Sequence, residues 1–182
     1  MPKQNAEMVA VTALGQDRPG IVRDVTQVLW RAKCNLHDTS MTILSGRFAM
    51  ILIASVPQSQ KKQLQKGLAA LEKKTHLHID VSRINRSKKA NNQTPSAIVT
   101  VIGADHPGIV CSVAKLLSQK KANITDLNSK ILTSKQKKVY VMIVEIALPA
   151  KMTLPSLQRS LSHLAKRLRV DIQCQPLHAH RL

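Results

Sequence analysis

The chain has 182 residues, of which 28 are Lys or Arg and 10 are Asp or Glu, so its formal net charge is +18. Apolar residues make up 43%, enough for packed cores, but no stretch approaches the roughly 20 apolar residues of a membrane-spanning helix, and the N-terminus lacks the apolar segment of a secretory signal. The three cysteines, Cys34, Cys111 and Cys174, are odd in number and far apart, which excludes a disulfide framework or zinc cluster and indicates a cytoplasmic protein with no membrane partner.

The first predicted elements are a strand and a helix. Residues 9–14 form a β-branched apolar run that predicts a buried strand. Beyond the loop Gly15-Gln16-Asp17-Arg18-Pro19-Gly20, apolar residues recur at helical spacing and predict an amphipathic helix that begins near Ile21. We expect this helix to end near residues 32–35, where Asn35 suits a left-handed C-terminal position.

The following residues predict a hairpin, a second helix and a closing strand. Residues 36–44 and 48–56 have strand character and are joined by a short Ser-Gly turn. A helix with periodic leucines follows, and residues 77–84 close the unit as a strand. Residues 85–95 are rich in Ser, Lys, Asn and Gln, which indicates a linker.

The second half of the chain repeats the first. The segment Gly15–Val22 reappears as Gly103–Val110, and the segment Asn35–Asp38 reappears as Asn123–Asp126, both displaced by 88 residues. The leucines of the second helix recur 93 residues later, with a longer predicted hairpin between them and the first helix. The paired leucines are Leu64 with Leu157, Leu68 with Leu161, and Leu71 with Leu164. A duplicated unit is therefore present.

Each copy has the element order βαββαβ. This order predicts an α+β protein of two tandem ferredoxin-like domains, each an antiparallel sheet with two helices on one face. We assign residues 1–84 to the first domain and residues 96–182 to the second, with the linker between them.

The loop before each first helix is the candidate site. Exposed amides and the positive end of the helix dipole can hold a carboxylate. Asp17 can cap free N–H groups, Pro19 suits a position just inside the helix start, and Gly20 permits close approach of a ligand. Asn35 or Asp38 can reach the ammonium group of an amino acid if the hairpin places the second strand beside the first. The alternative is that the loop only provides good turn and capping chemistry.

The repeated Gly-x-Asp-x-Pro-Gly-Ile-Val loops, the downstream Asn-[Leu/Ile]-x-Asp elements and the βαββαβ order together resemble tandem ACT domains. The layout of two such modules in about 180 residues is similar to the glycine cleavage system transcriptional repressor group. This resemblance implies a homo-oligomeric regulator of transcription or metabolism that senses an amino acid, with glycine or serine favoured, and acts through a protein partner such as a transcriptional activator. The strong basicity is unexpected for that group.

The resemblance and the loop chemistry assign one ligand site to each copy. The first site comprises Asp17, Arg18, Pro19, Gly20, Ile21, Val22, Asn35 and Asp38. The second site comprises Asp105, His106, Pro107, Gly108, Ile109, Val110, Asn123 and Asp126. Because Arg18 corresponds to His106, the two sites are expected to differ.

Two other classes of function are weighed against a regulator. Neither copy contains a catalytic set, a metal-spaced cluster or a Gly-rich phosphate loop, so we expect no enzyme, cofactor or metal site. The stronger alternative is a basic nucleic-acid-associated protein with the same fold and no ligand sensing. RNA-binding modules of this topology stack bases on aromatic residues of the sheet face, whereas this chain has only Trp30, Phe48 and Tyr140. Direct binding to nucleic acid is therefore possible but not favoured.

Overall fold

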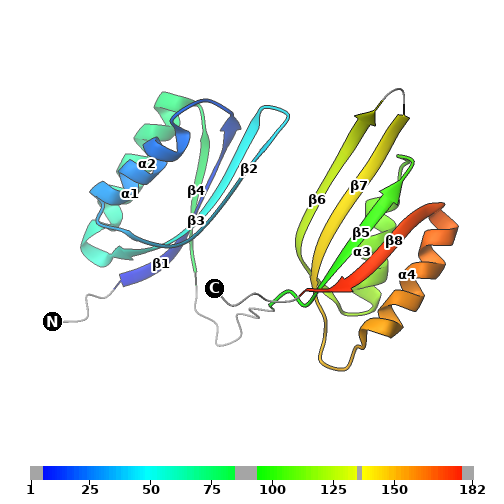
Figure 1. Ribbon diagram of the computed structural model, residues 1–182. Coiled ribbons are helices and arrows are strands. Elements are labelled where there is room, and N and C mark those ends of the chain that lie inside the picture. The colour runs from blue at the N-terminus through cyan, green and yellow to red at the C-terminus, as the bar shows by residue number, and fades with distance from the viewer. Residues whose placement is uncertain (1–5, 85–93, 135–136, 178–182) are drawn as a thin grey trace. The chain divides into compact units, whose positions relative to one another are not determined.

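The computed structural model describes residues 6–84, 94–134 and 137–177. It divides into two compact units, unit 1 (Met1–Ala90) and unit 2 (Asn91–Leu182). In each unit, both helices lie on one face of a four-stranded sheet (Figure 1). Residues 85–93 of the predicted linker lie outside the described residues.

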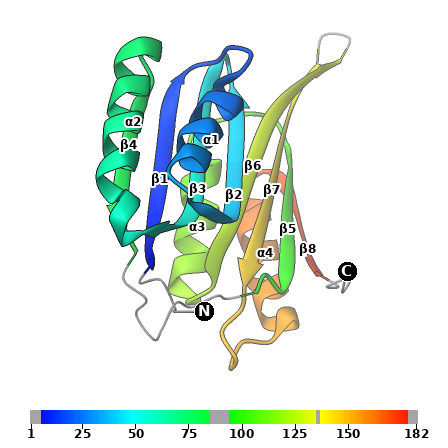
Figure 2. The ribbon, with the colours of Figure 1, turned by 90° about the vertical axis from the view of Figure 1, so that its left-hand side faces the viewer.

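Unit 1 follows the predicted order. Its elements are β1 (Ala6–Gln16), α1 (Ile21–Arg31), β2 (Asn35–Leu44), β3 (Arg47–Pro57), a 3₁₀ turn (Gln58–Gln60), α2 (Lys61–Thr75) and β4 (His78–Arg83). The strands are antiparallel in the order β2-β3-β1-β4. Figure 2 looks onto the helices of this unit, with β2 at the edge of the sheet.

Unit 2 has the same topology. Its elements are β5 (Ala97–Gly103), α3 (Ile109–Gln119), β6 (Asn123–Ser134), β7 (Lys137–Ala147), α4 (Leu154–Leu168) and β8 (Val170–Pro176). The strand order is β6-β7-β5-β8, again antiparallel. The predicted fold class, two tandem ferredoxin-like βαββαβ units, is confirmed.

Each core lies between the helices and the sheet. Alternate residues of β3, such as Phe48, Met50 and Leu52, are buried under the helices, whereas Ile51 between them is half exposed. The edge strand β2 extends beyond this cover and is exposed along its whole length. No helix in the described part of the chain is long and apolar enough to cross a membrane.

The helix ends differ from the prediction. The left-handed residue after α1 is Lys33 (φ 52°), and its counterpart after α3 is Lys121 (φ 57°). Asn35 and Asn123 instead begin β2 and β6 in extended backbone. The prediction that Asn occupies the left-handed position was wrong. The chain adopts the left-handed conformation two residues before the Asn, at a Lys, although Asn is the residue type that suits this conformation better.

Candidate site at the strand–helix loops

The loop of unit 1 is held at both ends by backbone hydrogen bonds. The Asp17 N–H donates to the Gly46 carbonyl (2.8 Å), which joins the loop to the β2–β3 turn. Gly20 is the N-cap of α1 with φ 90°, and its carbonyl accepts the Asp24 N–H (2.9 Å). Pro19 therefore precedes the cap, and the prediction that it lies inside the helix start was wrong.

The loop of unit 2 repeats this backbone geometry. Gly108 is the N-cap of α3 with φ 96°, and its carbonyl accepts the Ser112 N–H at 2.9 Å. Neither α1 nor α3 receives a hydrogen bond from a capping side chain, so the expected capping by Asp17 was also wrong. The first N–H groups of a helix have no partner within the helix, and both helices therefore present amides that a ligand can bind.

The two glycines of each loop are required for different physical reasons. A Cβ on Gly15 would lie 2.5 Å from the Leu77 side chain, and one on Gly103 would lie 2.7 Å from Val170. These first glycines therefore permit close packing of the strand end. Gly108 has no atom within 4 Å of such a Cβ, but its positive φ disfavours any L side chain.

An ion-paired cluster supports the loop of unit 1. The Asp24 carboxylate accepts hydrogen bonds from the guanidinium groups of Arg18 (2.8 Å) and Arg23 (2.8 Å). The hydrogen bond from Arg18, followed by that from Arg23, lowers the pKa of Asp24 below its ordinary value. Sequence reasoning missed Asp24, although an acid in the first turn of a helix is a recognisable signal.

Unit 2 replaces this cluster with a single histidine contact. His106, the counterpart of Arg18, forms a hydrogen bond between Nε2 and the Leu168 carbonyl (2.8 Å), at the end of α4. Ser112 occupies the position of Asp24. Arg18 therefore contacts the helix that follows its own loop, whereas His106 connects its loop to the other helix of the unit.

The polar residues of the edge strands lie far from the loops of their own unit. Strand β3 lies between β2 and β1, so the condition under which Asn35 or Asp38 reaches the loop is not met. Asn35 is opposite Ser55 and thereby level with Met8, eight residues from the end of β1, or about 26 Å at ~3.3 Å per residue.

The same separation holds in unit 2. Asp126 is level with Ile98, at the opposite end of β5 from the loop, and Asn123 lies beyond it. The structure thus brings together the loop residues of each predicted site but not the strand residues, namely Asn35, Asp38, Asn123 and Asp126. Within one unit these four residues do not group with the loop, and their assignment to the ligand sites stays a prediction.

The loop side chains differ in exposure. Ile21 and Ile109 are 2% exposed and belong to the cores, so only their backbone amides can face a ligand. Val22 and Val110 are each 40% exposed beside the helix start. Asp17 and Asp105 are exposed, and neither carboxylate has a hydrogen-bond or ion-pair partner within the described residues.

The aromatic residues do not form a stacking platform. Phe48 and Tyr140 are 3% and 8% exposed, on the helix side of their sheets. Trp30 on α1 is 75% exposed, so its side chain is not part of the core of unit 1. Among residues 6–84, 94–134 and 137–177, no three His, Cys, Asp or Glu side chains gather as a metal site would require.

Comparisons with known proteins give the same result for both units. The family model of the ACT domain matches residues 7–82 and 96–175. The glycine cleavage system transcriptional repressor of Escherichia coli K12 is 24% identical over 147 residues, covering 80% of this chain and 76% of the repressor. A protein of unknown function from Galdieria sulphuraria is 26% identical, with a TM-score of 0.83, and the match covers 96% of this chain and 100% of that one. A crystal structure of a protein assigned to the same repressor group shares the fold (TM-score 0.73, 19% identity, covering 96% of this chain and 99% of that one).

Proposed function

We propose that this chain, which belongs to the ACT domain family, is a non-catalytic regulator that binds a free amino acid at its two strand–helix loops. The observation that carries the proposal is the repeated loop geometry, in which a glycine N-cap leaves the amides of α1 and α3 open. The carboxylate of an amino acid binds these amides, and the exposed carboxylate of Asp17 or Asp105 binds its ammonium group.

Relatedness to the glycine cleavage system repressor supports glycine as the ligand, with serine second. Val22 and Val110 follow the N-cap glycines by two residues and are each 40% exposed, so they are available to contact the side chain of the ligand. In this account the bound amino acid changes the affinity of the chain for a protein that acts in transcription. That change can be no larger than the difference in ligand affinity between the two states.

Association of copies is part of the proposal. The edge strands β2 and β6 carry exposed apolar side chains, including Ile43 (49%) and Ile131 (51%), and exposed edges of this kind tend to pair. Asn35 and Asp38 can then approach a loop only from a second module. Light scattering on Ile43→Lys and Ile131→Lys variants tests this: we expect smaller assemblies than the wild type forms, and a wild-type monomer contradicts the association.

A thermal-shift screen against the twenty amino acids tests ligand binding, because a ligand that binds only the folded state raises the unfolding temperature. The variants Val22→Glu and Val110→Glu place a carboxylate beside the amides, where it competes with the ligand. Val22→Gln and Val110→Gln are controls of nearly equal size without the charge. We expect the Glu variants to lose the shift from their own loop and the Gln variants to keep it. Substitution of Gly20 is less informative, because its φ of 90° makes any side chain strained.

The nucleic-acid alternative rests on the net charge of +18 alone. The burial of Phe48 and Tyr140 removes the stacking surface that RNA-recognition modules use. Binding through phosphates alone would be strongly salt-dependent and independent of sequence. If the affinity for an oligonucleotide changes when glycine is added, the chain both senses an amino acid and binds nucleic acid. If the chain binds an oligonucleotide but responds to no amino acid, the nucleic-acid alternative is favoured.

A further inference from the structure

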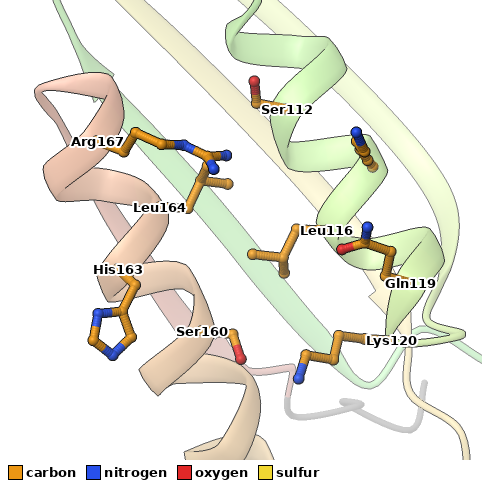
Figure 3. A pocket seen from close by; sticks show the side chains of 9 residues that line it. Ser112, Leu116, Gln119, Lys120, Ser160, His163, Leu164 and Arg167 are labelled. Atoms are coloured by element: carbon orange, nitrogen blue, oxygen red, sulfur yellow. The ribbon is translucent and has the colours of Figure 1, made fainter.

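A groove runs between α3 and α4 on the outside of unit 2. It encloses about 480 Å³, within the roughly 300–1,000 Å³ range of small-molecule sites. Helix α3 contributes Ser112 and Lys115 and is followed by its C-cap residue Lys120. Helix α4 contributes Ser160 and Arg167 (Figure 3). The groove begins one helical turn beyond Gly108, because the N–H of the lining residue Ser112 donates to the Gly108 carbonyl.

The helical spacing explains the composition of the groove. On each helix the lining positions recur at i, i+3, i+4 and i+7, so they form a single face. Leu116 and Leu164 both lie between the two helices (Figure 3), and Leu164 is only 3% exposed. Hydroxyl, amide, imidazole, ammonium and guanidinium groups surround this apolar floor, and all of them can donate hydrogen bonds.

The positive charges of the groove are not neutralised. Neither α3 nor α4 contains an Asp or Glu, and every ion pair found among residues 6–84, 94–134 and 137–177 lies in unit 1. The dipole of α4 favours a cation such as Arg167 in its last turn, but Lys115 lies in the middle of α3, where that effect is absent. An anionic ligand would neutralise the charges of Lys115, Lys120 and Arg167.

Unit 1 has less space and a different set of charges at the corresponding place, where Lys74 is the counterpart of Arg167, Arg31 of Gln119 and Asp24 of Ser112. The counterpart of Ser160 is Gly67, and a Cβ there would lie 2.7 Å from the Val28 side chain, so α1 and α2 pack closely. Lys115 and Lys120 correspond to the uncharged Gln27 and Ala32. Ser160, Lys115 and Lys120 are therefore features of the second copy that the first copy does not share.

We propose that this groove binds a small ligand that carries two or more phosphate groups, of the polyphosphate class. Arg167 lies at one end of the groove and Lys120 at the other (Figure 3), and the α3 segment from Ser112 to Lys120 spans about 12 Å at ~1.5 Å per residue. A single phosphate cannot contact both ends. A guanidinium binds phosphate in a bidentate manner, so Arg167 anchors one phosphate group, while Lys115 and Lys120 bind the others.

Calorimetric titration with tripolyphosphate tests the proposal on the full chain. The variant Lys115→Gln/Lys120→Gln/Arg167→Gln removes the three groove cations. The matched control Lys62→Gln/Lys66→Gln/Lys73→Gln removes three exposed cations from α2, so the change in net charge is equal. We expect the groove variant to bind at least about tenfold more weakly, since a hydrogen bond to a charged group is worth about 1.5–3 kcal/mol, and the control to bind within about twofold of the wild type. Circular dichroism verifies that both variants fold.

Three outcomes would overturn the proposal. Equal weakening by the groove variant and the control would mean that net charge alone attracts the anion. Undiminished binding by the groove variant would place the anion elsewhere. Binding of a short oligodeoxythymidylate through the three cations, without binding of tripolyphosphate, would identify a nucleic-acid surface instead. The glycine response of the loops is measured separately on the same variants, and its loss or retention does not affect this test.

Discussion

The two helices pack against each other differently in the two units. In unit 1, Gly67 lets α2 approach Val28 closely, and Asp24 is paired with Arg18 and Arg23. In unit 2, a serine replaces the glycine, and α3 and α4 carry no acidic residue. Both helix layers are basic, but in one copy the helices pack closely and include acidic residues, whereas in the other a groove separates them and neither helix has an acidic residue. A duplicated module can therefore keep its loop geometry while its helix surface changes its chemistry.

The largest loss of stability is expected from adding a single Cβ between α1 and α2. Gly67→Ser places a Cβ 2.7 Å from the Val28 Cγ1, and the overpacking should exceed the gain in helix propensity and destabilise unit 1 by about 1–2 kcal/mol. Urea unfolding followed by circular dichroism measures the change. Adding Val28→Ala should relieve the clash, so that the double variant loses less than the sum of the single losses. Additive losses would mean that the contact does not set the helix separation.

A smaller effect is expected from the charge cluster. Asp24→Asn leaves Arg18 and Arg23 without their carboxylate and should cost about 1 kcal/mol at neutral pH. Because the pKa of Asp24 is lowered in the folded state from 3.8, its contribution is complete above about pH 4 and is lost as the pH falls through the folded value. The stability difference between wild type and variant should therefore shrink below pH 4. A difference that is constant with pH would contradict the assignment.

The smallest effect concerns a pair of matched aromatic residues. Tyr140 lies opposite Gly103 as Phe48 lies opposite Gly15, but the Tyr140 hydroxyl is buried and has no hydrogen-bond partner in the described part of the chain. Tyr140→Phe should leave the unfolding free energy unchanged or raise it by less than about 1 kcal/mol, because the desolvation cost of the hydroxyl disappears. A clear loss of stability would mean that the hydroxyl has a partner.

Much of the fold was predictable because the duplication shows the sequence pattern of each helix and strand twice. The recurrence of Gly15–Val22 and of the periodic leucines defined the element order, and the loops lie where the sequence predicted. The condition under which Asn35 or Asp38 reaches the loop of its own unit is not met, because sequence spacing does not reveal that β3 lies between β2 and β1. A carboxylate such as Asp24 escaped notice because its role depends on two arginines that surround it only after the helix forms.

The groove of unit 2 was also missed, although the sequence contains its signal. The replacement of Gly67 by Ser160 and the absence of acids from the second pair of helices are visible once the two copies are aligned. Their meaning depends on how closely two helices approach, which is a property of packing. Comparison of the copies position by position, beyond the shared motif, would have detected both changes.

Calorimetric titration of glycine into the wild-type chain and into the Val22→Glu/Val110→Glu double variant is the decisive test of amino-acid binding at the strand–helix loops. We expect saturable binding to the wild type, no binding to the double variant, and retained binding to the Val22→Gln/Val110→Gln control. Equal binding of glycine by all three proteins would contradict the assignment of the ligand to the strand–helix loops.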